Sequence, residues 1–227
     1  MKHGKKYLEA KKLIDKTKKY SISEAIELAK KVAYTKFDPT LEVHIQTNAN
    51  PKYNDQQVRG TVVLPHGTGK SVKVAAFVSD DKIEEAKKAG ADIAGNAELL
   101  QKIENGEIDF DVLVTTPEMM RDLAKVARIL GPKGLMPSPK AGTVTPKLAD
   151  TISEIKKGRV EFKLDKGGVI HVGIGKLRSF DNKQLEENLQ ALIDAVKAAK
   201  PSGVKGQLIK KVHIAPTMGP GIQVAAN

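Results

Sequence analysis

The chain lacks several residue types that particular classes of protein need. It has no cysteine among its 227 residues, which excludes disulfides, thiolate metal sites and cysteine catalysis and is typical of a reducing compartment. No apolar run approaches the roughly 20 residues of a membrane span, and no apolar signal core follows the basic start. The sequence therefore predicts a soluble protein of the cytoplasm, or of an organelle of bacterial descent, with no membrane partner.

Aromatic and acidic residues are scarce as well. Phe, Tyr and Trp make up 4% of the chain with no Trp, so few rings are available to stack on the bases of a single strand. The 38 Lys and Arg outnumber the 27 Asp and Glu, which leaves a formal charge of +11. Lys and Arg gain affinity for phosphates by releasing condensed counterions. The composition thus indicates a polyanionic partner, and a folded RNA read by shape and phosphates fits best.

One stretch has no carboxylate at all. It lies between Asp122 and Asp150, and inside it residues 128–143 read RILGPKGLMPSPKAGT. Glycines alternate with prolines there, which predicts a loop held in fixed turns. Its cations project without an acidic partner and indicate a secondary contact patch, with an ordinary solvated loop as the alternative. The patch consists of Arg128, Lys133 and Lys140.

Hydrophobic periodicity predicts two domains of different style. Residues 68–158 alternate strand and helix, which is typical of a small parallel sheet covered by helices. Residues 1–67 and 159–227 share an α+β pattern that the middle lacks. We therefore predict a discontinuous two-domain chain, an α+β domain from both termini with an inserted Rossmann-like α/β domain. The chain crosses between them twice, which predicts a hinge at Gly67, Gly69, Gly158 and Arg159.

The expected elements follow from the same patterns. In the terminal parts they are a basic helix within 2–19, a capped helix after Ser21, strands at 41–45, 60–65 and 208–215, a hairpin of 160–164 with 169–173, and a helix at 182–199. In the middle they are strands at 72–78, 91–93 and 111–116 and helices at 80–89, 97–103, 117–129 and 146–157.

Nothing in the sequence completes a cofactor or catalytic motif. His66–Ser71 resembles part of a nucleotide phosphate loop, but position 64 is Leu where the motif needs Gly. The five histidines, at 3, 44, 66, 171 and 213, show no ligand spacing, and no group resembles a nucleophile with its base. We predict no cofactor, no metal and no catalytic residue. A nucleotide-dependent enzyme built on the middle domain is the weaker alternative.

The segment TMGPG, residues 217–221, is different. It follows a predicted strand and places a small hydroxyl, a flexible apolar residue and bare backbone in succession. Such a group can lie against a sugar-phosphate backbone, with Thr217 hydrogen-bonding and Met218 packing on a ribose or base. A simple turn at the chain end is the alternative.

Together with that segment, Gln57–Lys70, Gly131–Val144 and Lys36–Glu42 resemble the bacterial-type ribosomal protein L-one family of the large subunit. The resemblance implies a non-enzymatic two-domain protein that binds a folded segment of large-subunit ribosomal RNA. It also implies a mobile side stalk near the tRNA exit site that assists release of deacylated tRNA, and repression of the protein's own messenger RNA. Outside the ribosome it implies a monomer.

The resemblance also implies the principal RNA-binding residues. They are Lys36, Phe37, Glu42, Lys166, Thr217, Met218 and Gly219. Two positions depart from the family's pattern, since hydroxyl residues are frequent where this chain has Lys211 and Pro216. We expect Lys211 to contact a phosphate instead, which would make binding more salt-dependent. A general architectural protein for nucleic acid, DNA included, is the remaining alternative.

Overall fold

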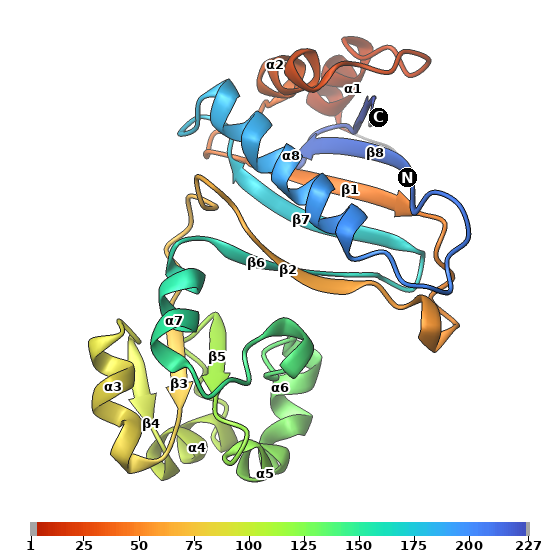
Figure 1. The fold of residues 1–227 in the computed structure, drawn as a ribbon. Coiled ribbons are helices and arrows are strands. Elements are labelled where there is room, and N and C mark those ends of the chain that lie inside the picture. Colours follow the sequence, from red (N-terminus) through yellow and green to blue (C-terminus); the bar gives the residue numbers. More distant parts are fainter. Residues whose placement is uncertain (1–3, 226–227) are drawn as a thin grey trace. The chain divides into compact units, whose positions relative to one another are not determined.

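The computed structural model describes residues 4–225, and the chain forms two compact units (Figure 1). The first combines the chain up to Lys70 with the chain from Val160 onward, and the second comprises Ser71–Arg159. The sequence placed the divisions after residues 67 and 158, and the contacts place them after 70 and 159. Both units combine helices with a sheet, so the fold class is mixed α/β. Within 4–225, no helix is long and apolar enough to cross a membrane.

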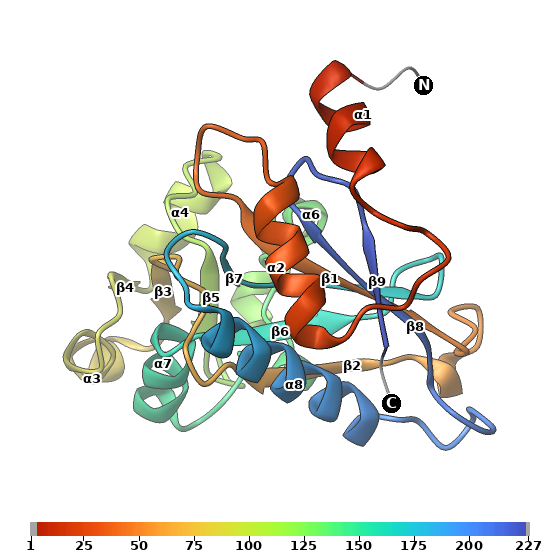
Figure 2. The same ribbon diagram turned by 90° about the horizontal axis from the view of Figure 1, so that it is seen from above.

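The first unit is built on a four-stranded sheet in the order β7-β1-β8-β9, in which β1 pairs antiparallel with both β7 and β8. Helices α2 and α8 pack next to each other on one face of this sheet (Figure 2). A separate two-stranded sheet joins β2 to β6. The elements are α1 (Lys5–Lys12), α2 (Ile22–Val32), β1 (Thr40–Thr47), the 3-10 helix η1 (Asn54–Gln56), β2 (Arg59–Val63), β6 (Arg159–Lys163), β7 (Val169–Lys176), α8 (Asn182–Ala198), β8 (Ile209–Pro216) and β9 (Ile222–Val224).

Burial alternates along β1 as the sequence predicted. Leu41, Val43 and Ile45 are fully buried, while the residues between them are only partly covered. Successive side chains of a strand point to opposite faces, so the apolar set faces α2 and α8 and the polar set lies on the other side. Each fully buried aliphatic side chain contributes about 1.5–3 kcal/mol relative to an exposed one. The polar side is called the open face below.

Of the first two predicted helices, one is shorter than expected and the other begins where expected. The basic helix predicted within 2–19 is only the eight residues of α1, because Asp15 Oδ1 accepts from the backbone N–H of Thr17 at 2.9 Å and from its hydroxyl at 2.7 Å. Such local side-chain bonds compete with helical ones. The predicted start of α2 is confirmed, since Ser21 and Glu24 form a reciprocal capping box.

The predicted hairpin around Asp165–Gly168 forms only at its turn. The Asp165 N–H donates to Val169 O at 2.9 Å, and a single bridge joins Leu164 to Ile170. Beyond it the strands separate, because β6 pairs with β2 while β7 pairs with β1. The prediction of two paired strands was therefore wrong. Turn residues fix a local reversal but do not decide which distant strand completes each ladder.

The second unit contains a small parallel sheet, as predicted, and its three strands lie in the order β4-β3-β5. Two apolar clusters contain its helices, one with residues of α4, α5 and α6 and the other with residues of α3 and α7. The elements are β3 (Val74–Phe77), η2 (Asp80–Lys82), α3 (Ile83–Lys88), β4 (Ile93–Gly95), α4 (Ala97–Glu104), β5 (Val112–Thr115), α5 (Met120–Leu123), η3 (Ala124–Val126), α6 (Ala127–Lys133), η4 (Pro139–Ala141) and α7 (Leu148–Lys156).

The acid-free segment is not the continuous loop that its composition predicted. Helix α6 runs through Gly131 and Pro132 and ends at Gly134, which has a left-handed φ of 72°. The Gly134 N–H donates to Gly131 O and the Leu135 N–H to Leu130 O, both at 3.0 Å. This pair of bonds is a Schellman motif, which satisfies carbonyls at the helix end. Glycine here ends a helix instead of preventing one, and only the second half of the segment is turns.

Asn188 of α8 is fully buried and joins three segments of the first unit. Its Oδ1 accepts from the backbone N–H of His66 at 3.1 Å. Its Nδ2 donates to Gly67 O at 3.0 Å and to Ile174 O at 2.8 Å. The Asn188 side chain therefore joins α8 to β7 and to the turn at His66 and Gly67, which leads to the first chain crossing.

We expect Asn188→Leu to lower the free energy of unfolding by about 2–4 kcal/mol, because one buried and two partly buried backbone groups would lose their partner. Urea denaturation followed by circular dichroism measures this change. The matched control is Gln190→Leu, an exposed position on the same helix, which should stay within about 0.5 kcal/mol. Equal effects of the two substitutions would contradict the anchoring role of Asn188.

Candidate nucleic-acid interface

The open face of the first unit carries a polar row from each central strand. On β1 these residues are Glu42, His44 and Gln46, and the register places each one between partners on β7 and β8. Glu42 lies between Gly173 and Ala215, and Gln46 lies between Val169 and Lys211. The open face is thus shared by strands that are more than a hundred residues apart in sequence.

The segment TMGPG is a turn between two strands and not a chain end. β9 pairs antiparallel with β8 in the register Ile214 to Ile222, which the sequence did not reveal because β9 has only three residues. The Gly219 N–H donates to Pro216 O at 2.7 Å and closes a β-turn. A Cβ on Gly219 would overlap the Pro216 ring, so this glycine has a steric reason of its own. The hairpin explains why the turn is held at the sheet.

Met218 occupies the third position of that turn. Its φ is 70°, and it is the one non-glycine residue with positive φ in the part of the chain that the structure describes. Turns of this type favour Gly or Asn there, because a Cβ is strained in the left-handed region. Met218 is 68% exposed, and the Tyr34 hydroxyl donates to its carbonyl. A strained backbone therefore presents a large apolar side chain to solvent.

The loop with Lys36 and Phe37 is rigidly held beside this turn. The Arg178 guanidinium donates to Lys36 O at 3.1 Å and also to Thr35 O, and Phe37 is 55% exposed. Asp38 accepts from the Arg178 N–H at 2.9 Å and from the Ser179 hydroxyl. Burial raises the pKa of Asp38, but these hydrogen bonds outweigh it and the pKa is lowered. Sequence reasoning missed these residues, because they act through backbone groups 140 positions away.

Thr217 uses its hydroxyl within the protein. The Thr40 N–H donates to Thr217 Oγ1 at 3.1 Å, and that oxygen lies 3.2 Å from Thr40 O and 3.3 Å from Glu42 Oε1. The Thr217 N–H also donates to Thr40 O at 3.0 Å. The sequence predicted a direct ligand contact for this hydroxyl. The geometry makes it the tie between the Met218 turn and the start of β1.

Six of the eight predicted contact residues thus gather at one end of β1. The other two, Lys166 and Lys211, lie toward its far end, since Lys211 is opposite Gln46 and Lys166 precedes β7. At about 3.4 Å per residue this end is roughly 20 Å from Thr40. Lys166 sits in a turn that Asp165 builds, because Asp165 Oδ1 accepts from the N–H groups of Gly167 and Val169, both at 2.8 Å. The hydrogen bond from Val169 is the largest contribution that lowers the pKa of Asp165.

Three histidines fill the middle of the open face and form the histidine row, His171–His44–His213. The register pairs His44 with each of the others, and the Nδ1 atoms of His44 and His171 are 2.7 Å apart. Burial lowers the pKa of His44, and neighbouring His171 lowers it further. Burial and then Lys211 lower the pKa of His213. Sequence spacing gave no sign of this row, and the histidine at position 3 lies outside the described residues.

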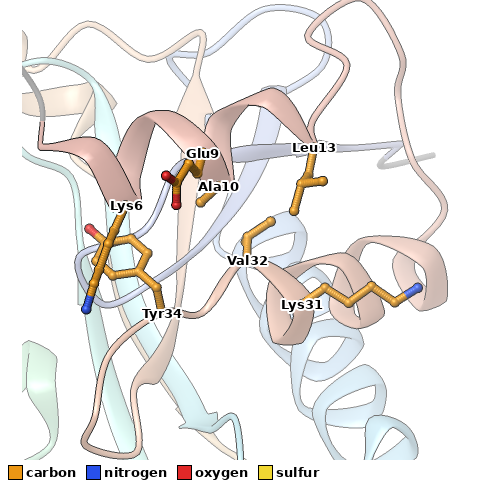
Figure 3. A pocket seen from close by; sticks show the side chains of 7 residues that line it. All are labelled: Lys6, Glu9, Ala10, Leu13, Lys31, Val32 and Tyr34. Carbon is orange, nitrogen blue, oxygen red and sulfur yellow. The ribbon is translucent and has the colours of Figure 1, made fainter.

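A groove of about 440 Å³ lies between α1 and the end of α2 (Figure 3). Lys6 and Tyr34 both line it, and the Tyr34 hydroxyl donates to the Met218 carbonyl. The groove has mixed polarity and contains no pair of a nucleophile and a base. Its lining is Lys6, Glu9, Ala10, Leu13, Lys31, Val32 and Tyr34.

The residues predicted as the hinge have distinct local roles. Gly67 and Gly69 have a φ of 68° and Gly158 one of 104°, so all three use a conformation that glycine tolerates best. The Arg159 guanidinium donates to Glu154 at 2.9 Å and to Ala141 O at 3.3 Å. Ala141, in the acid-free segment, therefore accepts a hydrogen bond from Arg159, the last residue of the second unit.

The predicted secondary patch is exposed on the second unit. Arg128 and Lys133 belong to α6 and Lys140 to η4, and all three are exposed. Among residues 4–225, no three His, Asp or Glu side chains form a group able to hold a metal ion.

Comparisons with known proteins agree with this description. A model described as the ribosomal protein L1p/L10e family matches residues 29–220. The chain is 55% identical to large ribosomal subunit protein uL1 of Kosmotoga olearia over 223 residues, 98% of this chain and 96% of that protein. It is 53% and 52% identical to the proteins of that name from Thermosipho africanus and Thermosipho melanesiensis, over 224 residues with the same coverage. The chain therefore belongs to the ribosomal protein L1p/L10e family, a structural and non-enzymatic family.

Proposed function

We propose that this ribosomal protein binds large-subunit ribosomal RNA through the open face and the Met218 turn of its first unit. Its relatives are named large ribosomal subunit proteins. Residues 71–159 carry 14 Lys and Arg against 14 Asp and Glu, whereas the rest of the chain carries 24 against 13. The excess positive charge favours the first unit as the part that holds phosphates. Membership of a non-enzymatic family sets the nucleotide-dependent enzyme aside.

The observation that carries this proposal is the strained and exposed Met218. A left-handed conformation costs an L-residue about 1–2 kcal/mol. A glycine at position 218 would avoid that cost, yet the glycine of this turn is at position 219. Because Met218 is 68% exposed, burial of apolar surface does not compensate for that cost. Strain of this kind persists where it serves a function, and an apolar tip beside Lys36 and Phe37 suits a ribose or base face next to phosphates.

The proposal extends to the roles that the family resemblance implies. The first unit would stay on the RNA, and the nearly neutral second unit would move about Gly67, Gly69, Gly158 and Arg159 as a mobile side stalk. Glycines with positive φ at both chain crossings support such a hinge. Release of deacylated tRNA would depend on that movement. A similar RNA fold in the protein's own messenger would bind the same face and repress translation.

Met218→Gly separates function from stability. Glycine relieves the left-handed strain, so the free energy of unfolding should stay within about 1 kcal/mol of the wild type or rise. The affinity for transcribed large-subunit ribosomal RNA should fall at least tenfold, because the apolar contact is lost. Urea denaturation and filter binding measure the two quantities. Unchanged RNA affinity would remove Met218 from the site.

Two matched pairs of lysines test which unit holds the RNA. Lys36→Gln with Lys166→Gln in the first unit should reduce the slope of log affinity against log salt by about 2, since each lost phosphate contact removes close to one unit. Lys133→Gln with Lys140→Gln in the second unit should change the affinity less than threefold. Filter binding over a salt series gives both values.

The same measurements decide between this proposal and a general architectural protein. Duplex DNA as competitor should bind at least roughly a thousandfold more weakly than the ribosomal RNA at fixed salt. Equal competition by DNA would favour the architectural protein. A tenfold loss in the Lys133 and Lys140 variant would instead make the acid-free segment part of the primary site.

A further inference from the structure

The histidine row lies between two groups of proposed RNA contacts. One group surrounds Met218 at the Thr40 end of β1, and the other, Lys166 with Lys211, lies at the Gln46 end. An RNA that contacts both groups must pass over the middle of the open face. His44 occupies that middle position, paired with His171 on one side and His213 on the other. What His44 offers to such an RNA depends on where its protons lie.

A chain of hydrogen bonds fixes those protons. Asp165 Oδ2 lies 3.3 Å from His171 Nε2, and an ionised carboxylate can only accept, so His171 Nε2 carries the hydrogen. When both rings are uncharged, the one hydrogen between the two Nδ1 atoms, which are 2.7 Å apart, therefore belongs to His44. Neutral His44 is therefore left with a bare Nε2. The turn that presents Lys166 thus sets the tautomer of a residue on another strand.

This nitrogen is open to a ligand. Within residues 4–225, Thr116 Oγ1 is the only buried side-chain nitrogen or oxygen that lacks a hydrogen-bonding partner. His44 Nε2 is not among such atoms, and the His44 residue is only partly covered. It is an acceptor on the open face of a protein whose surface is rich in Lys and Arg, which only donate.

The surroundings favour the uncharged ring. The 2.7 Å contact between the Nδ1 atoms has room for only one hydrogen, so His44 and His171 cannot both be cations. Burial and His171 lower the pKa of His44, and the Glu42 carboxylate acts in the opposite direction without reversing the shift. The other titratable groups around the row are Asp165, His171, Lys211 and His213.

We propose that His44 accepts a hydrogen bond through Nε2 from a ribose 2′-hydroxyl of the bound RNA. The 2′-hydroxyl is the donor that distinguishes RNA from DNA, and a bare imidazole nitrogen is a suitable acceptor for it. Lysines on the same face hold phosphates of either nucleic acid, so His44 adds discrimination that charge alone does not give. This inference rests on the proposed function, since it concerns the same face and ligand.

The test is an interference map with three full-length proteins: wild type, His44→Leu and His44→Gln. Large-subunit ribosomal RNA transcripts carry scattered 2′-deoxynucleotides, and bound and free pools are compared at each position. The wild type should show at least one position at which the deoxy substitution weakens binding. His44→Leu should lose that interference and bind intact RNA about tenfold more weakly. His44→Gln, whose amide oxygen can replace Nε2, should retain the interference.

Gln190→Leu on α8 is the control, because it lies on the helix that covers the opposite face of the sheet. It should give the wild-type map. Identical maps for the wild type and His44→Leu would overturn the role of His44 while leaving RNA binding itself intact. Failure of the wild type to bind the RNA at all would instead overturn the proposed function.

The uncharged state of His44 also predicts how stability depends on pH without any RNA. Its pKa in the unfolded chain is about 6.5 and its folded value is lower, so the unfolded chain binds more protons between the two. The free energy of unfolding should therefore fall as the pH drops from 7.5 to 5.5. His44→Gln should show a smaller fall in urea denaturation. An identical fall would show that folding does not hold His44 uncharged.

Discussion

The first unit depends on one constraint, the hydrogen-bonded pairing of β1 with two strands that come far later in the chain. β1 begins at Thr40, and its partners begin at Val169 and Ile209. Backbone groups buried in the middle of a sheet must be paired, so this strand cannot form its ladders until both ends of the chain have met. The apolar side of β1 then completes the core with α2 and α8, and its polar side becomes the open face.

The candidate interface follows from that pairing. Most of its predicted contact residues lie in loops that β1 and β8 bring together, and hydrogen bonds within the unit hold those loops in place. Arg178 and Asp38 hold the Lys36 loop, Tyr34 and Thr217 hold the Met218 turn, and Asp165 holds the Lys166 turn. A surface that recognises a folded RNA by shape needs such rigidity, because ordering flexible loops on binding would reduce the affinity.

Much of the fold could be predicted from local patterns. Alternation identified β1, the capping residues located α2, and the strand-helix rhythm of the middle predicted the parallel sheet. Two local predictions were wrong. The turn at Asp165–Gly168 was found but its strands pair elsewhere, and glycine with proline near residue 131 predicted a loop where α6 continues. In both cases local chemistry is compatible with two structures, and distant packing chooses between them.

By itself the sequence determined the composition of the candidate interface: the excess of Lys and Arg, the motifs that identify the family, and the short segment with Met218. These depend only on which residues are present and in what order. Only the tertiary structure decided that Met218 is strained, that the Thr217 hydroxyl is used internally, and that three histidines form a row. The Met218 turn depends on the pairing of β8 with the three residues of β9. The other two depend on strand register between segments more than a hundred residues apart, and register is set by the packing of the whole unit.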